Sequence, residues 1–105
     1  MADKTRKQQL EELLELDPDD SFVRYGLAME HASAGQDDEA VKFLDELLRR
    51  DPGYVPAYLQ AGRALIRVGD DERARDVLRR GIVVAQRAGE DHAAGEMAGF
   101  LESLG

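Results

Sequence analysis

Two histidines are the only imidazole side chains in this sequence, and no cysteine accompanies them. His31 and His92 lie too far apart along the chain for a metal-binding pair on one helix, which needs a spacing of about four residues. The sequence also contains no G-x-S-x-G nucleophile motif, no P-loop and no G-x-G-x-x-G motif. We therefore expect no enzymatic activity, no metal and no cofactor. His31 is expected among packed helices, and His92 at an exposed helix start.

Three acidic clusters raise the alternative of a divalent-cation site, at residues 17–20, 37–39 and 70–72. A calcium loop needs ligands at alternating positions, a central Gly and a Glu at the twelfth position, and none of the clusters has this pattern. Each cluster instead precedes a segment with helical spacing. There, carboxylates cap free backbone N–H groups and oppose the positive end of the helix dipole, so capping is the preferred interpretation.

The charge balance narrows the class of partner. The 105 residues include 14 Lys and Arg against 22 Asp and Glu, a formal net charge of −8. An acidic surface disfavours binding to nucleic acid or to an anionic membrane, because both need basic side chains. The longest wholly apolar run, residues 82–85, is far below the roughly 20 residues of a membrane span. We expect one cytoplasmic domain, whose Asp-rich, Lys-poor composition fits either a high-salt habitat or a genome rich in Arg codons.

The elements that carry these residues follow from a repeat of 34 residues. At this offset Gly35, Asp37, Ala40 and Leu44 recur as Gly69, Asp71, Ala74 and Leu78. The same offset relates Leu10 to Leu44, Glu12-Leu13-Leu14 to Glu46-Leu47-Leu48, and Asp17-Pro18 to Asp51-Pro52. Residues 1–105 are therefore expected to form a single domain in which one unit is used more than once.

Apolar side chains within each period recur at helical spacing, and no segment of useful length alternates like a strand. The pattern predicts an all-α chain of five to six helices, at about 4–16, 21–34, 37–50, 56–68, 71–87 and 91–104. The Asp-Pro pairs end the first and third helices, and Gly35 and Gly69 end the second and fourth. Because the connections are short, neighbouring helices must run antiparallel.

A helix–turn–helix period of this length, with small side chains at fixed places, resembles the tetratricopeptide repeat. The matching positions are Ala28, Gly35, Ala40 and Pro52 in one repeat and Gly62, Gly69 and Ala74 in the next. The resemblance implies a right-handed repeat array: a half repeat at 4–18, repeats at 21–54 and 55–88, and a capping helix at 91–104. Two departures stand out, since Arg24 occupies a position held by an aromatic residue (Tyr58 in the second repeat), and Gly81 replaces a usual Ala.

In this family the first helices of the repeats line a concave groove that receives a peptide or a partner helix. The resemblance implies these groove residues: Phe22, Tyr25, Met29, Leu59, Arg63, Ile66, Arg67, Met97, and also Ala93 and Phe100. The alternative for Phe22, Ile66 and Phe100 is packing between helices. The family's Lys and Asn clamp for a C-terminal carboxylate is missing, because Tyr25, Met29 and Gln60 occupy its positions.

The function expected from this resemblance is a non-catalytic protein-binding module. Apolar groove residues would supply desolvation energy, and Arg63 and Arg67 would select acidic groups on the partner. A homodimer that buries the groove is the alternative. The monomer is favoured, because Glu90, Asp91, Glu96 and Glu102 make the closing helix polar.

Overall fold

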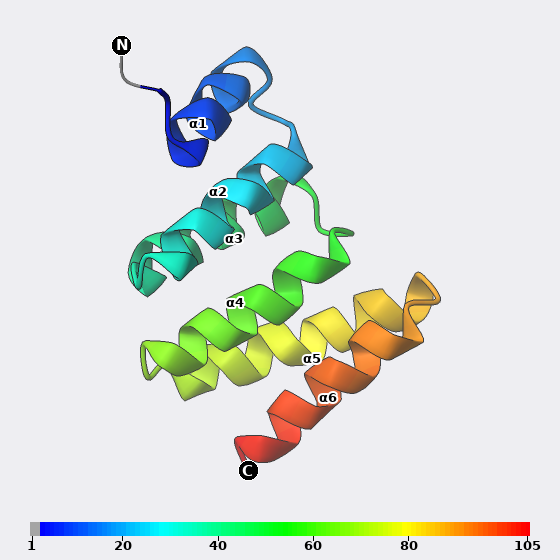
Figure 1. Ribbon diagram of the computed structural model, residues 1–105. Helices are drawn as coiled ribbons and strands as arrows, with labels where there is room; N and C mark the ends of the chain where they lie inside the picture. The colour runs from blue at the N-terminus through cyan, green and yellow to red at the C-terminus, as the bar shows by residue number, and fades with distance from the viewer. Residues whose placement is uncertain (1–2) are drawn as a thin grey trace.

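The computed structural model describes residues 3–105, and within them the secondary structure consists of six α-helices (Figure 1). They are α1 (Arg6–Leu16), α2 (Ser21–Ser33), α3 (Asp37–Arg50), α4 (Val55–Arg67), α5 (Asp71–Arg87) and α6 (Asp91–Ser103). The expected all-α class and helix number are confirmed. The first two residues of the domain expected at 1–105 lie outside the described residues.

Side-chain caps set several of the helix starts. Asp20 Oδ1 accepts a hydrogen bond from the Val23 N–H at 3.0 Å, and Asp70 Oδ1 accepts one from the Arg73 N–H at 3.2 Å. Two acidic clusters therefore cap helices as expected. The third does not: α3 begins after Gln36, which makes no side-chain cap bond, and the acids at 37–39 lie in the first turn. There they oppose the helix dipole.

Glycines with left-handed backbone end the first helix of each pair. Gly35 has φ of 75° and Gly69 has φ of 84°, a conformation that only glycine adopts without strain.

Thr5 and Gln8 form a reciprocal capping box before the first helix, so α1 begins at Arg6, two residues later than expected.

The helices form two layers, with α2, α4 and α6 in one and α3 and α5 behind them in the view of Figure 1. The described chain is elongated, 50 × 28 × 20 Å. A continuous core runs between the layers, and its largest fully buried side chains are Leu44, Leu47, Leu65, Leu78 and Met97. Helix α1 covers only one side of α2, through a smaller cluster of Leu10, Val23 and Leu27.

Small side chains lie where paired helices approach closely. Ala28, Ala40 and Ala74 have no solvent exposure. A Cβ atom added to Gly62 would lie 2.5 Å from Leu78 Cδ2, well inside van der Waals contact. The small residue that the repeat places at position 62 predicted that α4 and α5 approach closely, and the position of Gly62 confirms this prediction.

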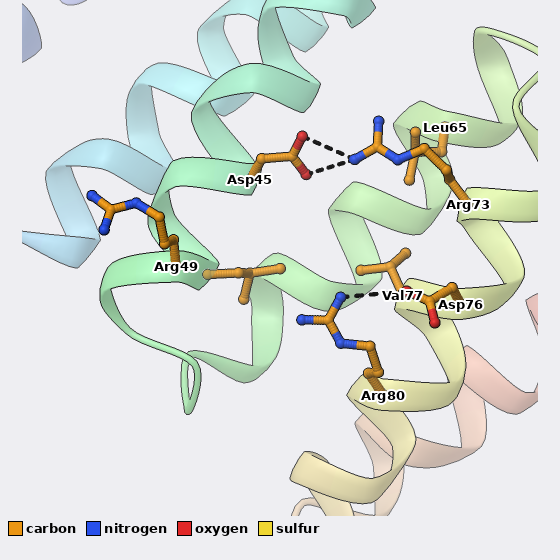
Figure 2. A pocket seen from close by; sticks show the side chains of 8 residues that line it. Asp45, Arg49, Leu65, Arg73, Asp76, Val77 and Arg80 are labelled. Carbon is orange, nitrogen blue, oxygen red and sulfur yellow. Dashed lines mark hydrogen bonds and ion pairs between the residues drawn. The ribbon is translucent and has the colours of Figure 1, made fainter.

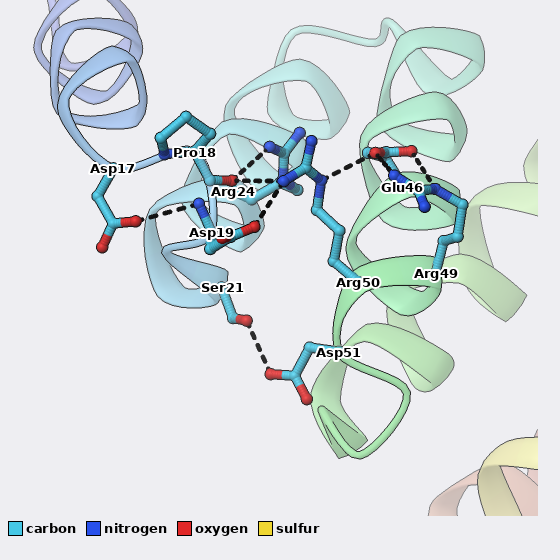
Figure 3. Close-up of polar contacts among 9 residues, drawn as sticks. All are labelled: Asp17, Pro18, Asp19, Ser21, Arg24, Glu46, Arg49, Arg50 and Asp51. Atoms are coloured by element: carbon cyan, nitrogen blue, oxygen red, sulfur yellow. Dashed lines mark hydrogen bonds and ion pairs between the residues drawn. The ribbon is translucent and has the colours of Figure 1, made fainter.

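Figure 3 shows a polar network that ties the start of α2 to the end of α3. Arg24 Nη2 donates to the Pro18 carbonyl at 2.7 Å, and Arg50 Nη1 donates to Asp19 Oδ1 at 2.6 Å. Ser21 Oγ donates to Asp51 Oδ2 at 2.7 Å across the two helices. The Arg24 bond explains the family departure at this position. Its counterpart in the second repeat, Tyr58, donates its O–H to the Pro52 carbonyl at 2.6 Å.

Acid is expected to weaken one part of this network. Hydrogen bonds from Arg49 and Arg50 lower the pKa of Glu46 from 4.5 to about 2. A carboxylate with a lowered pKa stabilises the folded state above its ordinary pKa and loses that contribution as the pH falls towards the lowered value. At pH 6 we expect the melting temperature of wild type to be slightly above that of Glu46→Gln. The margin is small because the carboxylate is still partly in contact with solvent.

That margin is expected to shrink between pH 4.5 and pH 2. Thermal unfolding followed by circular dichroism at pH 6, 4 and 2 measures it for both proteins. If the difference in melting temperature stays constant across these three pH values, folding does not lower the pKa of Glu46.

No helix among residues 3–105 is long and apolar enough to cross a membrane. The same residues contain no group of three or more metal-ligating side chains placed to hold a metal ion.

Candidate interaction surface on α2, α4 and α6

A pocket of about 230 Å³ opens where α2, α4 and α6 meet. We call it the groove pocket, and it is lined by Tyr25, Val55, Pro56, Leu59, Gln60, Glu90, Ala93 and Glu96. Helices α2 and α4 begin at equivalent positions of the repeat, Ser21 and Val55, so both present the same face to the pocket. Apolar atoms dominate this lining, and two carboxylates stand beside them.

Tyr25 is the best-placed aromatic side chain of the groove pocket. Its ring lies 5.5 Å from the ring of Tyr54, centroid to centroid, which fixes its orientation. Burial raises the pKa of the Tyr25 hydroxyl, while the nearby Gln60 amide and Arg63 guanidinium act in the opposite direction. The hydroxyl is therefore protonated at neutral pH.

Arg63 and Phe100 link α4 to α6 beside the groove pocket. The guanidinium carbon of Arg63 lies 5.8 Å from the centre of the Phe100 ring, within cation–π range. Arg63 is exposed and Phe100 is half-buried against the core. Together they place a cation and an aromatic ring beside each other outside the lining of the groove pocket.

Arg67 is engaged within the protein. Its Nε donates to Asp37 Oδ1 at 2.9 Å, which joins the end of α4 to the start of α3. The partner lies 30 residues away in the sequence, so spacing alone could not identify it. Arg67 is thus a bridge between helices as well as a surface residue.

The remaining expected groove residues separate into three cases. Met97 is fully buried, so its side chain is part of the core and offers no surface to a partner; this corrects the expectation. Met29 and Ile66 are half-buried and pack against the core. Phe22 is 70% exposed at the start of α2, outside the lining of the groove pocket, and so does not pack between helices.

Both histidines have the environments expected of them. His31 is buried, its Nδ1 lies 2.8 Å from Gln36 Oε1, and its ring stacks on Phe43 with centroids 5.0 Å apart. His92 is almost fully exposed, with Nε2 3.1 Å from a Glu96 oxygen. His31 is a structural side chain with satisfied polar atoms.

Sequence reasoning missed a second pocket, of about 250 Å³, between α3 and α5 (Figure 2). Arg73 Nη2 donates to both carboxylate oxygens of Asp45, at 3.1 and 3.0 Å, and Arg80 Nη1 lies 3.4 Å from Asp76. Arg73 and Asp45 are 28 residues apart on different helices, a pairing that no local pattern reveals. Two of the three arginines in this lining are thus paired with its two aspartates, and the third, Arg49, pairs with Glu46 outside the lining.

Known proteins share the repeat of this chain at the level of sequence. A family model described as "Tetratricopeptide repeat" matches residues 7–52 and 32–95. A repeat-containing protein of Pseudomonas aeruginosa, described by the same repeat, is 30% identical over 95 residues, which are 90% of this chain and 90% of that protein.

Solved structures show the same arrangement of helices. A protein from Bordetella parapertussis superposes with a TM-score of 0.84 at 29% identity, over 97% of this chain and 89% of that chain. PcrH, solved in complex with the chaperone binding region of PopD, superposes with a TM-score of 0.88 over 93% of this chain and 74% of that chain. Its identity is 18%, so this second likeness concerns the fold alone.

Proposed function

Because the chain belongs to the tetratricopeptide repeat family, we propose that it is a non-catalytic interaction module that holds a peptide segment or partner helix against α2, α4 and α6. Residues 21–54 and 55–88 form its two repeats in this proposal, with 4–18 as a leading half repeat and 91–104 as a closing helix. The proposed location is the cytoplasm.

The observation that carries this proposal is the groove pocket, which crosses three helices and is open at the surface. Tyr25 and Leu59 are half-buried there, so each has apolar surface left to cover. A few central, well-packed side chains, with Tyr prominent among them, contribute most of the binding energy of protein interfaces. The binding of a PopD region by PcrH supports a peptide partner for this fold in general.

The proposed contact surface extends from this pocket along the exposed parts of the three helices. Arg63 and Phe100 flank it on one side. The other proposed members, which contribute less accessible surface or lie outside the lining, are Phe22, Met29, Ile66 and Arg67.

Truncation of side chains that line the groove pocket is expected to abolish most peptide binding. Peptides would first be selected on the wild-type chain from a random twelve-residue library, and their affinities measured by fluorescence anisotropy. Leu59→Ala and Tyr25→Ala are each expected to weaken these affinities at least about tenfold, as for central interface residues. Val83→Ala, which truncates an exposed apolar side chain of α5, is the matched control and should leave affinities unchanged.

Circular dichroism would confirm that each variant is folded. If peptides bind Leu59→Ala and Tyr25→Ala as tightly as wild type, the binding site lies elsewhere. Sedimentation velocity at low and high protein concentration tests the homodimer alternative. A dimer mass that is lost in Leu59→Ala would replace the peptide-binding proposal by self-association through the same face.

A further inference from the structure

We propose that the groove pocket selects partner segments in which a lysine or arginine stands next to an apolar residue. This inference rests on the proposed function, since it names the chemistry of the partner at the same site. It reverses the sequence-based expectation that Arg63 and Arg67 select acidic groups.

The charged side chains that line the groove pocket are both carboxylates, Glu90 and Glu96. Glu90 precedes the first turn of α6, and Glu96 follows on the same helix. Ala93 lies between them in the lining, and Leu59 of α4 contributes apolar surface beside them. The pocket therefore combines an apolar floor with a negative edge.

Neither of the arginines expected in the groove is among the residues that line the pocket. Arg67 Nε is paired with Asp37 Oδ1 at 2.9 Å. The guanidinium of Arg63 lies over the Phe100 ring, outside the lining, and is near enough to act electrostatically on the Tyr25 hydroxyl. The neighbour of Glu96 is His92, whose ring is almost fully exposed and can be displaced by a ligand.

Lysine and arginine match this combination because each has a long apolar stem and a cationic head. The stem of such a side chain can cover Ala93 and Leu59 while its head reaches the carboxylates. An attractive charge pair beside apolar surface is less screened than one in open solvent. The net charge of −8 also attracts basic segments and raises their association rate at low salt.

The same random twelve-residue library tests this inference when it is selected in parallel on wild type and on Glu90→Gln/Glu96→Gln. These substitutions remove both charges and keep the shapes of the side chains. Peptides enriched on wild type are expected to carry Lys or Arg beside an apolar residue, and this bias is expected to disappear on the double variant.

One enriched peptide would then be synthesised with its Lys or Arg replaced by Gln. On wild type at low salt the replacement is expected to weaken binding about fivefold to tenfold, and on the double variant to have little effect. Equal losses on both proteins, or enrichment without basic residues, would overturn the inference. Failure of the proposed function can be distinguished from failure of this inference. In that case the peptides would bind Leu59→Ala as tightly as wild type.

Discussion

Gly81→Ala is expected to destabilise the folded chain by about 3 kcal/mol, the largest effect of a single methyl group that we predict. The added Cβ would clash with the Cβ of Tyr58 and would lie 2.6 Å from Met97 Sδ. Tyr58 is held by its hydrogen bond to the Pro52 carbonyl at 2.6 Å, and Met97 has no solvent exposure. Because the Tyr58 Cβ is attached directly to the backbone of α4, it cannot move aside unless α4 and α5 separate.

Urea unfolding followed by circular dichroism measures this loss, and other glycines of the chain provide the controls. Gly62→Ala meets only the branched end of Leu78, a more flexible group, so its cost should be smaller. Gly95 and Gly99 on α6 have no atoms within 4 Å of an added Cβ. Their replacement by Ala is expected to stabilise the chain by about 0.5–1 kcal/mol through helix propensity. A Gly81→Ala midpoint equal to that of wild type would contradict the packing described here.

The contrast between Gly62 and Gly81 shows how far the repeat pattern could predict packing. Gly62 occupies a small-residue position of the repeat, so close approach to α5 was predictable from spacing. Gly81 was only visible as a departure from the family pattern. Its tight environment arises from α6 as well as α4, a three-helix contact that periodicity along one helix cannot show.

Met97 was misplaced by sequence reasoning, since its side chain is fully buried, and it lies on a helix where the repeat period changes. Helix α4 begins at Val55, one full period after the start of α2, but α6 begins at Asp91, two residues beyond the next full period. The two extra residues accompany the longer α5, which has 17 residues against 14 in α3. A shift of two residues on a helix is a rotation of about 200°. Ala93, expected in the groove together with Met97, does line the groove pocket, so the burial of Met97 reflects how α6 packs on α4 and α5 and not the period alone.

Helix α1 shows a similar limit to what the repeat pattern predicts about burial. Leu13 corresponds to Leu47 in the repeat, yet Leu13 is 49% exposed and Leu47 only 1%. Leu47 belongs to the continuous core between the layers, whereas α1 packs mainly on α2. Identity between repeats predicts helical structure well, and burial depends on the neighbours that each copy has.

Arg24→Ala is expected to destabilise the chain by about 2 kcal/mol, whereas Arg24→Tyr should remain close to wild type. Arg24 is almost covered, and its hydrogen bond to the Pro18 carbonyl at 2.7 Å holds the link between α1 and α2. Burial lowers the pKa of this guanidinium, with a further contribution from Arg50. Alanine would remove the donor, and Arg50 Nη1, 3.4 Å from the same carbonyl, is too distant to replace it fully.

Tyrosine can take over this role because the second repeat already uses it. Tyr58 is the repeat equivalent of Arg24, and it donates to Pro52, the repeat equivalent of Pro18. Urea unfolding of Arg24→Ala, Arg24→Tyr and Arg24→Phe separates the contribution of the hydrogen bond from that of apolar burial. Phenylalanine restores the apolar cover without the O–H donor. The free energy of unfolding of Arg24→Phe should therefore lie between those of the other two variants. Equal stability of Arg24→Phe and Arg24→Tyr would show that covering the helix junction, and not the bond to the proline carbonyl, is what both repeats require.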